Sequence, residues 1–142
     1  MFQKLPLLDQ LYKKFDNVDL RNSAIISCQH ILQSNYITLE YLFKLGLKPE
    51  HTFILGKSYS TNREVAKFLQ DRGVYIHSNS SSFNSHESWD AQFKNYVSEF
   101  IKDVMLKIND LSGIKQIIIV DDGGFVIEQI NQLKFSQKVQ CV

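Results

Sequence analysis

Short apolar runs alternate along the chain with segments in which apolar residues recur at helical spacing. Five runs rich in β-branched residues predict strands, at 24–28, 52–55, 74–76, 116–120 and, more weakly, 138–142. These runs are apolar at successive positions rather than at every second one. This pattern is typical of strands that are buried on both faces, as in a parallel sheet.

The segments between these runs predict helices over 7–15, 36–45, 89–108 and 125–133. A further helix is expected to follow Thr61-Asn62-Arg63-Glu64, which has capping-box spacing, and to end before Gly73. The alternation of strands and helices predicts one α/β domain over 1–142, a three-layer sandwich of the Rossmann-like or flavodoxin-like kind. Its five-stranded sheet is expected to be mostly parallel, with right-handed crossovers. The serine-rich stretch 78–88 is interpreted as a polar surface loop.

Composition narrows the function classes. The 142 residues are 44% hydrophobic and 22% charged, which is typical of a folded domain and excludes wholesale disorder. The 16 basic and 15 acidic residues leave a net charge of +1, so no global field favours nucleic acid or an anionic membrane. No apolar run approaches the ~20 residues of a membrane span, and the N-terminus does not resemble a secretory signal. The two cysteines, Cys28 and Cys141, are interpreted as reduced thiols of a cytoplasmic protein.

Candidate chemistry lies where the predicted strands end, because ligands of open parallel sheets bind beyond the carboxyl ends of the strands. Asp121-Asp122-Gly123-Gly124 follows one such strand. Two adjacent carboxylates repel each other, so one could hold a raised pKa if both are desolvated, and the glycines permit positive φ. An aspartate here could accept hydrogen bonds from sugar hydroxyls or orient a histidine. The alternative is a strand-to-helix turn capped by aspartate.

His30 follows the first predicted strand and could transfer protons near neutral pH, with Asp122 as its partner across the crevice. The alternative is a structural histidine. A metal site or a cysteine nucleophile built on Cys28 has no recognisable spacing. Ser60 and Thr61 offer hydroxyls and backbone N–H groups at a helix start, where they would suit a small polar ligand and would also cap the helix.

Two nucleotide-binding motifs fit poorly. Gly56-Lys57-Ser58 looks like the end of a phosphate-binding P-loop, but the motif needs glycine where the chain has His51. The aliphatic run 117–120 and its acidic pair suggest a phosphoribosyltransferase. That family continues with a hydroxyl-rich loop, whereas this chain continues with Gly-Gly-Phe.

The ordered set Cys28-Gln29-His30, Ser60-Thr61 and Asp121-Asp122-Gly123-Gly124 resembles the N-terminal substrate domain of S-adenosylhomocysteine hydrolases, over roughly residues 24–142. The resemblance implies a Rossmann-like substrate domain whose crevice holds an adenosine-like small molecule. It implies acid–base roles for His30 and Asp122. It also implies a ligand-binding surface formed by Ser60, Thr61, Asn62, Asp121, Gly123 and Gly124.

The chain departs from this family at Leu32, where the family has threonine, and at Phe125, where it has aspartate. It contains no Gly-x-Gly-x-x-Gly and has no room for the family's NAD-binding domain, so we expect no cofactor in this chain, and NAD only if another domain supplies it. We expect such a chain to be a fragment or truncated homologue that is not active alone. It could form a homo-oligomer or join a partner polypeptide. The alternative is a non-catalytic interaction or structural module.

Overall fold

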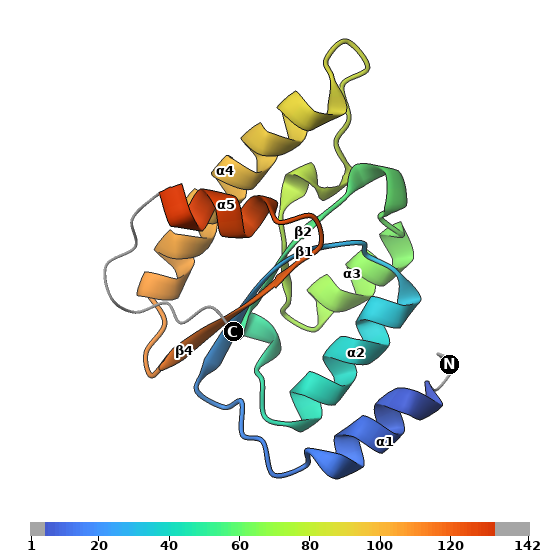
Figure 1. The fold of residues 1–142 in the computed structure, drawn as a ribbon, viewed down its shortest axis with the longest axis vertical. Coiled ribbons are helices and arrows are strands. Elements are labelled where there is room, and N and C mark those ends of the chain that lie inside the picture. Colours follow the sequence, from blue (N-terminus) through green and yellow to red (C-terminus); the bar gives the residue numbers. More distant parts are fainter. Residues whose placement is uncertain (1–4, 133–142) are drawn as a thin grey trace.

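The computed structural model describes residues 5–132, in which strands and helices alternate (Figure 1). The helices are α1 (Pro6–Lys14), α2 (Gln33–Lys44), α3 (Arg63–Asp71), α4 (Trp89–Asn109) and α5 (Phe125–Gln132). The strands are β1 (Ser23–Gln29), β2 (Thr52–Gly56), β3 (Tyr75–Ile76) and β4 (Gln116–Asp121). Short 3-10 turns occupy Pro49–His51, Ser58–Ser60 and Ser78–Ser81. The α/β class predicted from the sequence is therefore confirmed.

The described strands form one parallel sheet in the order β3-β2-β1-β4. In β1, Cys28 lies opposite Leu55 of β2 on one side and opposite Asp121 of β4 on the other. The strand order reverses between β1 and β4, because the chain first builds outward to β3 and then returns to the far side of β1. The sheet has four strands rather than the five expected, and the segment 138–142 lies outside the described residues.

Helices cover both faces of the sheet (Figure 1). On one face, Ala24, Ile26 and Cys28 of β1 pack into the same cluster as residues of α4 and α5. On the other face, Ile25 packs against α2, while Ile54 of β2 joins the cluster formed with α2 and α3. This alternation follows from the strand period of two. Burial of β1 and β2 on both faces explains why apolar residues occupy successive positions in these strands.

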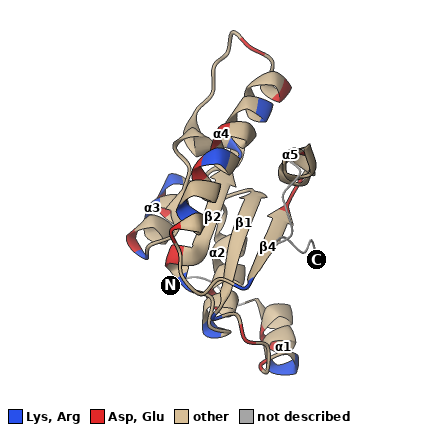
Figure 2. Cartoon of the chain, turned by 90° about the vertical axis from the view of Figure 1, so that its left-hand side faces the viewer, with Lys and Arg blue, Asp and Glu red and all other residues tan. Residues whose placement is uncertain are grey.

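Most charged residues of the described part of the chain lie on the helices and connections. Figure 2 shows basic and acidic residues mixed along α3 and α4, whereas β1 and β2 carry neither kind. Acidic residues appear at the end of β4, just before α5 (Figure 2). None of the described helices is long and apolar enough to cross a membrane.

One local prediction is wrong, and a second holds only in part. Thr61 does not cap α3; the cap is Asn62, whose side-chain oxygen accepts hydrogen bonds from the N–H groups of Glu64 and Val65 at 3.0 and 3.1 Å. The stretch 78–88 is mostly exposed, as predicted for a polar surface loop, but it begins with the 3-10 turn Ser78–Ser81, part of which is buried. Its Ser80 is buried, and the Ser80 hydroxyl accepts the Gly56 N–H at 2.8 Å, so it extends the hydrogen bonding at the end of β2.

Candidate functional site

Three polar side chains meet at the carboxyl ends of β1, β2 and β4: His30, Lys57 and Asp122. Because β1 lies between β2 and β4 in parallel register, the residues that follow these strands leave the sheet side by side. The Asp122 N–H donates to the Cys28 carbonyl at 2.8 Å and so continues the pairing of β1 with β4 one step beyond the strand end. The sheet thereby places the three side chains at the point where the strand order reverses.

One oxygen of Asp122 accepts two contacts. His30 Nε2 and Lys57 Nζ each lie 3.0 Å from Asp122 Oδ2. The Lys57 side chain is 10% exposed and that of Asp122 is 54% exposed, so the lysine is the buried partner and the carboxylate faces solvent. The hydrogen bond and charge of Lys57, and to a smaller extent those of His30, lower the pKa of Asp122 from 3.8. A raised pKa within the acidic pair is therefore wrong for Asp122, because the cation outweighs carboxylate repulsion.

The second ring nitrogen of His30 is also engaged. His30 Nδ1 forms a hydrogen bond with the Ser60 hydroxyl, which also lies 3.2 Å from the Lys57 carbonyl oxygen. When His30 is neutral and donates Nε2–H to Asp122, Nδ1 is an acceptor and the Ser60 hydroxyl must donate to it. When the ring is protonated, Nδ1–H donates and the hydroxyl can turn to the Lys57 carbonyl. Ser60 therefore accommodates both charge states of His30 without movement of the ring.

The adjacent Asp121 has a different task. Its Oδ2 atom accepts the Ile127 N–H at 3.0 Å within the first turn of α5, and its Oδ1 atom is buried. Asp121 therefore stabilises the start of α5, as the strand-to-helix alternative proposed, whereas Asp122 joins His30. Successive residues of an extended segment point in opposite directions, which separates the two carboxylates.

Cys28 lies beneath this site and is fully buried. Burial, assisted by the negative charge of Asp121, raises the pKa of its thiol to about 12. The thiolate form is therefore scarce at neutral pH, which disfavours both a nucleophile and a metal ligand. Among residues 5–132, no three His, Cys, Asp or Glu side chains gather in a metal-binding arrangement.

The two glycines after Asp122 adopt left-handed backbone conformations, with φ of +116° at Gly123 and +77° at Gly124. This is the permissive geometry that the sequence predicted for the turn. A Cβ on Gly123 would also lie 3.1 Å from the Phe125 ring. Phe125 packs edge-on against Phe93 at 5.2 Å, so an apolar core contact occupies the position where the resembling family has aspartate.

Thr61 and Asn62 contribute mainly to local structure. The Thr61 hydroxyl donates to the Lys57 carbonyl at 3.0 Å, and the Asn62 side chain caps α3. The Asn62 N–H donates to the Ile31 carbonyl at 2.9 Å, which ties the turn after β2 to the turn after β1. These two residues therefore hold the segments that carry Ser60 and His30 in place.

Sequence reasoning missed Lys57 as a member of the site. It considered this residue only as part of a P-loop that the sequence does not complete. The available signal was its position directly after the buried strand β2. A strand end next to an acidic pair is where a lysine can be both desolvated and neutralised. The sequence did not show which of the two carboxylates, Asp121 or Asp122, would pair with Lys57.

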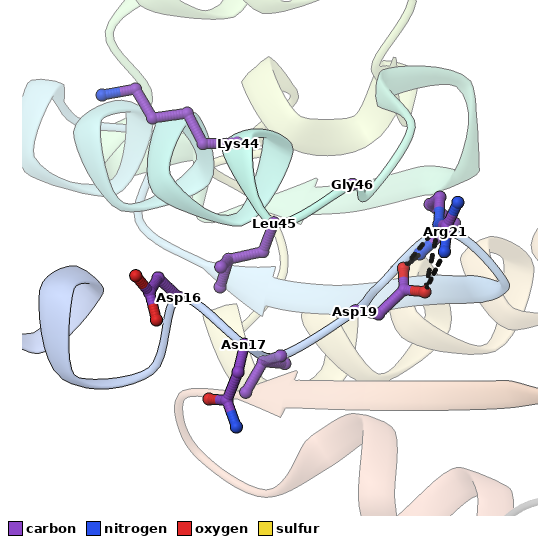
Figure 3. Close-up of a pocket in the computed structure, with 8 residues that line it drawn as sticks. Asp16, Asn17, Asp19, Arg21, Lys44, Leu45 and Gly46 are labelled. Carbon is purple, nitrogen blue, oxygen red and sulfur yellow. Dashed lines mark hydrogen bonds and ion pairs between the residues drawn. The ribbon is translucent and has the colours of Figure 1, made fainter.

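A hollow of about 320 Å³ lies away from this site and is lined by Asp16, Asn17, Val18, Asp19, Arg21, Lys44, Leu45 and Gly46 (Figure 3). It lies beside the segment that leads into β1, at the amino end of the sheet. Arg21 forms several hydrogen bonds with Asp19, so this charged pair is satisfied within the protein (Figure 3). The switch point between β1 and β4 therefore remains the candidate site.

Comparison with known proteins gives two relatives. They are uncharacterized proteins from two strains of Mycobacterium tuberculosis, and each is 30% identical to this chain over 122 residues. The alignment covers 86% of this chain and 24% of each relative, so the chain spans about a quarter of the length of the curated relatives it matches. No family model matches the chain. The search of solved structures returned no significant match.

Proposed function

We propose that this chain is an adenosylhomocysteinase-like substrate module that binds an adenosine-like nucleoside at the carboxyl edge of its sheet. The observation that carries the proposal is the Asp122 carboxylate, which His30 and Lys57 both hold through Oδ2. A half-exposed carboxylate fixed through one oxygen can offer the other oxygen to a ligand hydroxyl. The neighbouring hydroxyls of a ribose are suitable donors for such an acceptor.

The strand order supports this proposal. The order β3-β2-β1-β4 is that of the first strands of a Rossmann-like sheet, in which the ligand lies where the order reverses. His30 and Asp122 follow the two strands on either side of that reversal. A Rossmann-like substrate domain would therefore present these side chains directly to its ligand.

The charges also suit an uncharged sugar. Lys57 and Asp122 neutralise each other, and a neutral His30 adds no charge. The lowered pKa of Asp122 keeps it ionised at neutral pH, so it remains a hydrogen-bond acceptor. A neutral His30 would hold its proton on Nε2 toward Asp122 and accept a hydrogen bond from the Ser60 hydroxyl at Nδ1, which fixes the ring beside the carboxylate.

NAD does not fit the residues that this chain presents at the first turn. A dinucleotide needs a glycine-rich turn between β1 and α2, so that the backbone can approach the pyrophosphate. Here that turn is Gln29-His30-Ile31-Leu32, which contains no glycine. We therefore propose that this chain binds the ligand and is by itself incomplete for catalysis.

A second candidate is a non-catalytic interaction module. It is favoured by Tyr59 and Phe83, whose aromatic side chains are exposed beside the site and would suit a partner polypeptide or a second copy of the chain. The two proposals differ in what Asp122 does. A nucleoside site needs its carboxylate, whereas a protein interface over the aromatic residues does not.

The test is isothermal titration calorimetry with adenosine and with S-adenosylhomocysteine. We expect wild-type binding that is weakened at least about ten-fold in His30→Ala and in Asp122→Asn. Asp19→Asn, in the separate hollow, is the matched control and should bind as wild type does. Absence of heat with the wild-type chain would exclude the nucleoside site and leave the interaction module.

A second assay separates binding from catalysis. Homocysteine release from S-adenosylhomocysteine is measured with this chain and added NAD. We expect no release, because the turn after β1 does not fit the dinucleotide. Release that disappears in Asp122→Asn would contradict the incompleteness and assign the full reaction to these residues.

A further inference from the structure

Aromatic side chains stand directly beside the polar site. The Tyr59 ring lies 5.7 Å from the His30 ring and 5.0 Å from the Trp89 ring, and the Phe83 ring lies 6.4 Å from Trp89. We call Tyr59, Phe83 and Trp89 the aromatic wall. It joins the turn after β2, the stretch before α4 and the first residue of α4, so segments distant in the sequence build it together.

The aromatic wall is open to solvent yet anchored in the core. The side chains of Tyr59 and Phe83 are 65% and 61% exposed. Trp89, by contrast, stacks on the buried Phe93, with ring centres 4.8 Å apart and an interplanar angle of 21°. Exposed aromatic rings that rest on a fixed ring form a preorganised surface, which loses little side-chain freedom when a ligand covers it.

The residues around Tyr59 are also fixed. Tyr59 lies in the 3-10 turn Ser58–Ser60, which the Ser60 N–H closes by donating to the Lys57 carbonyl at 2.9 Å. The hydroxyl of Ser60 bonds to His30, so the same turn supports both the aromatic wall and the polar site. The position of Tyr59 is thereby coupled to that of the His30–Asp122 pair.

We propose that the aromatic wall is the base-stacking part of the ligand site and makes the ligand a nucleoside rather than a free sugar. This inference rests on the proposed function and deepens it. His30 contacts Asp122 on one side and Tyr59 on the other. In the proposed complex, the sugar of the ligand donates to Asp122 and the attached base lies against the Tyr59 ring. A planar base would cover the exposed rings and gain both dispersion and apolar burial.

The nature of stacking defines the ligand class. Aromatic faces recognise the π-face that every nucleobase has, whereas discrimination between bases needs hydrogen bonds to their edges. The aromatic wall therefore selects for a planar heteroaromatic ring attached to the sugar. Purines, with their larger rings, should bind more tightly than pyrimidines.

The chain contains a single tryptophan, so Trp89 reports directly on the aromatic wall. Adenosine is titrated while Trp89 fluorescence is followed, with calorimetry run in parallel to report binding independently of the fluorescence. D-ribose serves as the ligand without a base. We expect adenosine to quench Trp89 emission with the same midpoint as the calorimetric curve, and D-ribose to leave the emission unchanged.

Substitution of the exposed ring completes the test. Tyr59→Leu should weaken adenosine binding by about ten-fold, because it removes the aromatic face and keeps a similar apolar volume. Phe15→Leu, which removes an exposed aromatic ring at the end of α1 and outside the aromatic wall, is the matched control and should retain wild-type affinity. Phe83→Leu is the second variant. Because Phe83 is exposed, its substitution should not unfold the protein, so weaker adenosine binding by this variant would reflect the loss of the ring. Circular dichroism of each variant verifies that the fold is retained.

The outcomes separate the two proposals. Wild-type adenosine affinity in both Tyr59→Leu and Phe83→Leu would refute base stacking on the aromatic wall. The proposed nucleoside site at Asp122 would be unaffected by that result. Adenosine binding seen by calorimetry without any change in Trp89 emission would also refute base stacking on the aromatic wall. Absence of adenosine binding by the wild-type chain would overturn both, whereas quenching together with a Tyr59→Leu defect supports both.

Discussion

The ammonium group of Lys57 and the carboxylate of Asp122 form a 3.0 Å ion pair in which the cation is buried and the anion faces solvent. Removal of the lysine from water is costly unless an opposite charge compensates it. Asp122 supplies that charge, and in return Lys57 keeps the carboxylate ionised. The pair therefore gives the site a carboxylate that stays ionised and in place while its exposed side can meet a ligand.

Lys57→Met tests this electrostatic coupling. In the wild type, the lowered pKa of Asp122 gives a contribution to stability that is present above pH 3.8 and is lost as the pH falls through the lowered value. Lys57→Met should raise the pKa of Asp122 toward 3.8, which NMR titration of its carboxyl carbon measures. Lys67→Met, which removes an exposed partner of Asp71, is the control and should leave Asp122 unchanged. An unaltered Asp122 titration in Lys57→Met would show that the pair does not set this pKa.

The hydrogen bonds of His30 predict its tautomer. With Nε2–H donated to Asp122, the neutral ring should carry its proton on Nε2 and accept from Ser60 at Nδ1. Nitrogen-15 chemical shifts of the neutral His30 ring report which nitrogen is protonated. Ser60→Ala should keep the same tautomer, since Asp122 still accepts from Nε2. A neutral ring protonated on Nδ1 would contradict this arrangement.

Cys28 should be inert toward thiol reagents in the folded protein. With its pKa raised to about 12 by burial, only about one thiol in ten thousand is ionised at pH 8. The measurement is the rate of labelling by an aromatic disulfide, in a Cys141→Ser background so that Cys28 alone reacts. Labelling should become rapid only in denaturant. Rapid labelling without denaturant would place the thiol in contact with solvent.

Gly56→Ala should destabilise the fold by steric conflict at the end of β2. A Cβ at this position would lie 2.6 Å from the Thr61 hydroxyl oxygen and 2.7 Å from Ile31 Cδ1. Overpacking of this kind costs about 1–3 kcal/mol of unfolding free energy, measured by urea denaturation. Adding Ile31→Val, which deletes Cδ1, should make the double variant more stable than the sum of the single effects. If the losses of unfolding free energy in Gly56→Ala and Ile31→Val simply add in the double variant, the steric conflict does not involve Ile31 Cδ1.

Asn62→Ala should lower the unfolding free energy by about 1 kcal/mol, because it removes the oxygen that caps α3. Asn62→Asp keeps an acceptor at the same position and should retain most of the stability. Urea denaturation of the two variants compares them directly. Equal losses in both would mean that the side-chain oxygen does not stabilise α3.

Much of the fold can be predicted from local pattern. The strands β1, β2 and β4 coincide with apolar β-branched runs, and α4 follows the periodic segment that begins at Trp89. The strands β1 and β2 are buried on both faces, which favours apolar side chains at successive positions, and the sequence shows this pattern directly. The prediction was least accurate where one side chain competes with its neighbour, as with Thr61 and Asn62 at the start of α3. Both can cap a helix, and the contact of Thr61 with the Lys57 carbonyl decides between them.

The sequence by itself determined that His30 and the acidic pair follow strands of an α/β sheet, because the apolar runs and their polar ends are local features. Only the tertiary structure decided that Asp122, rather than Asp121, meets His30, and that Lys57 joins them. That choice depends on the register of β1 against β2 and β4 and on which way each side chain points beyond the strand end. Likewise, the aromatic wall arises when the turn after β2 packs against the start of α4. Contacts between distant segments have no local signature, because folding of the whole sheet and its helices creates them.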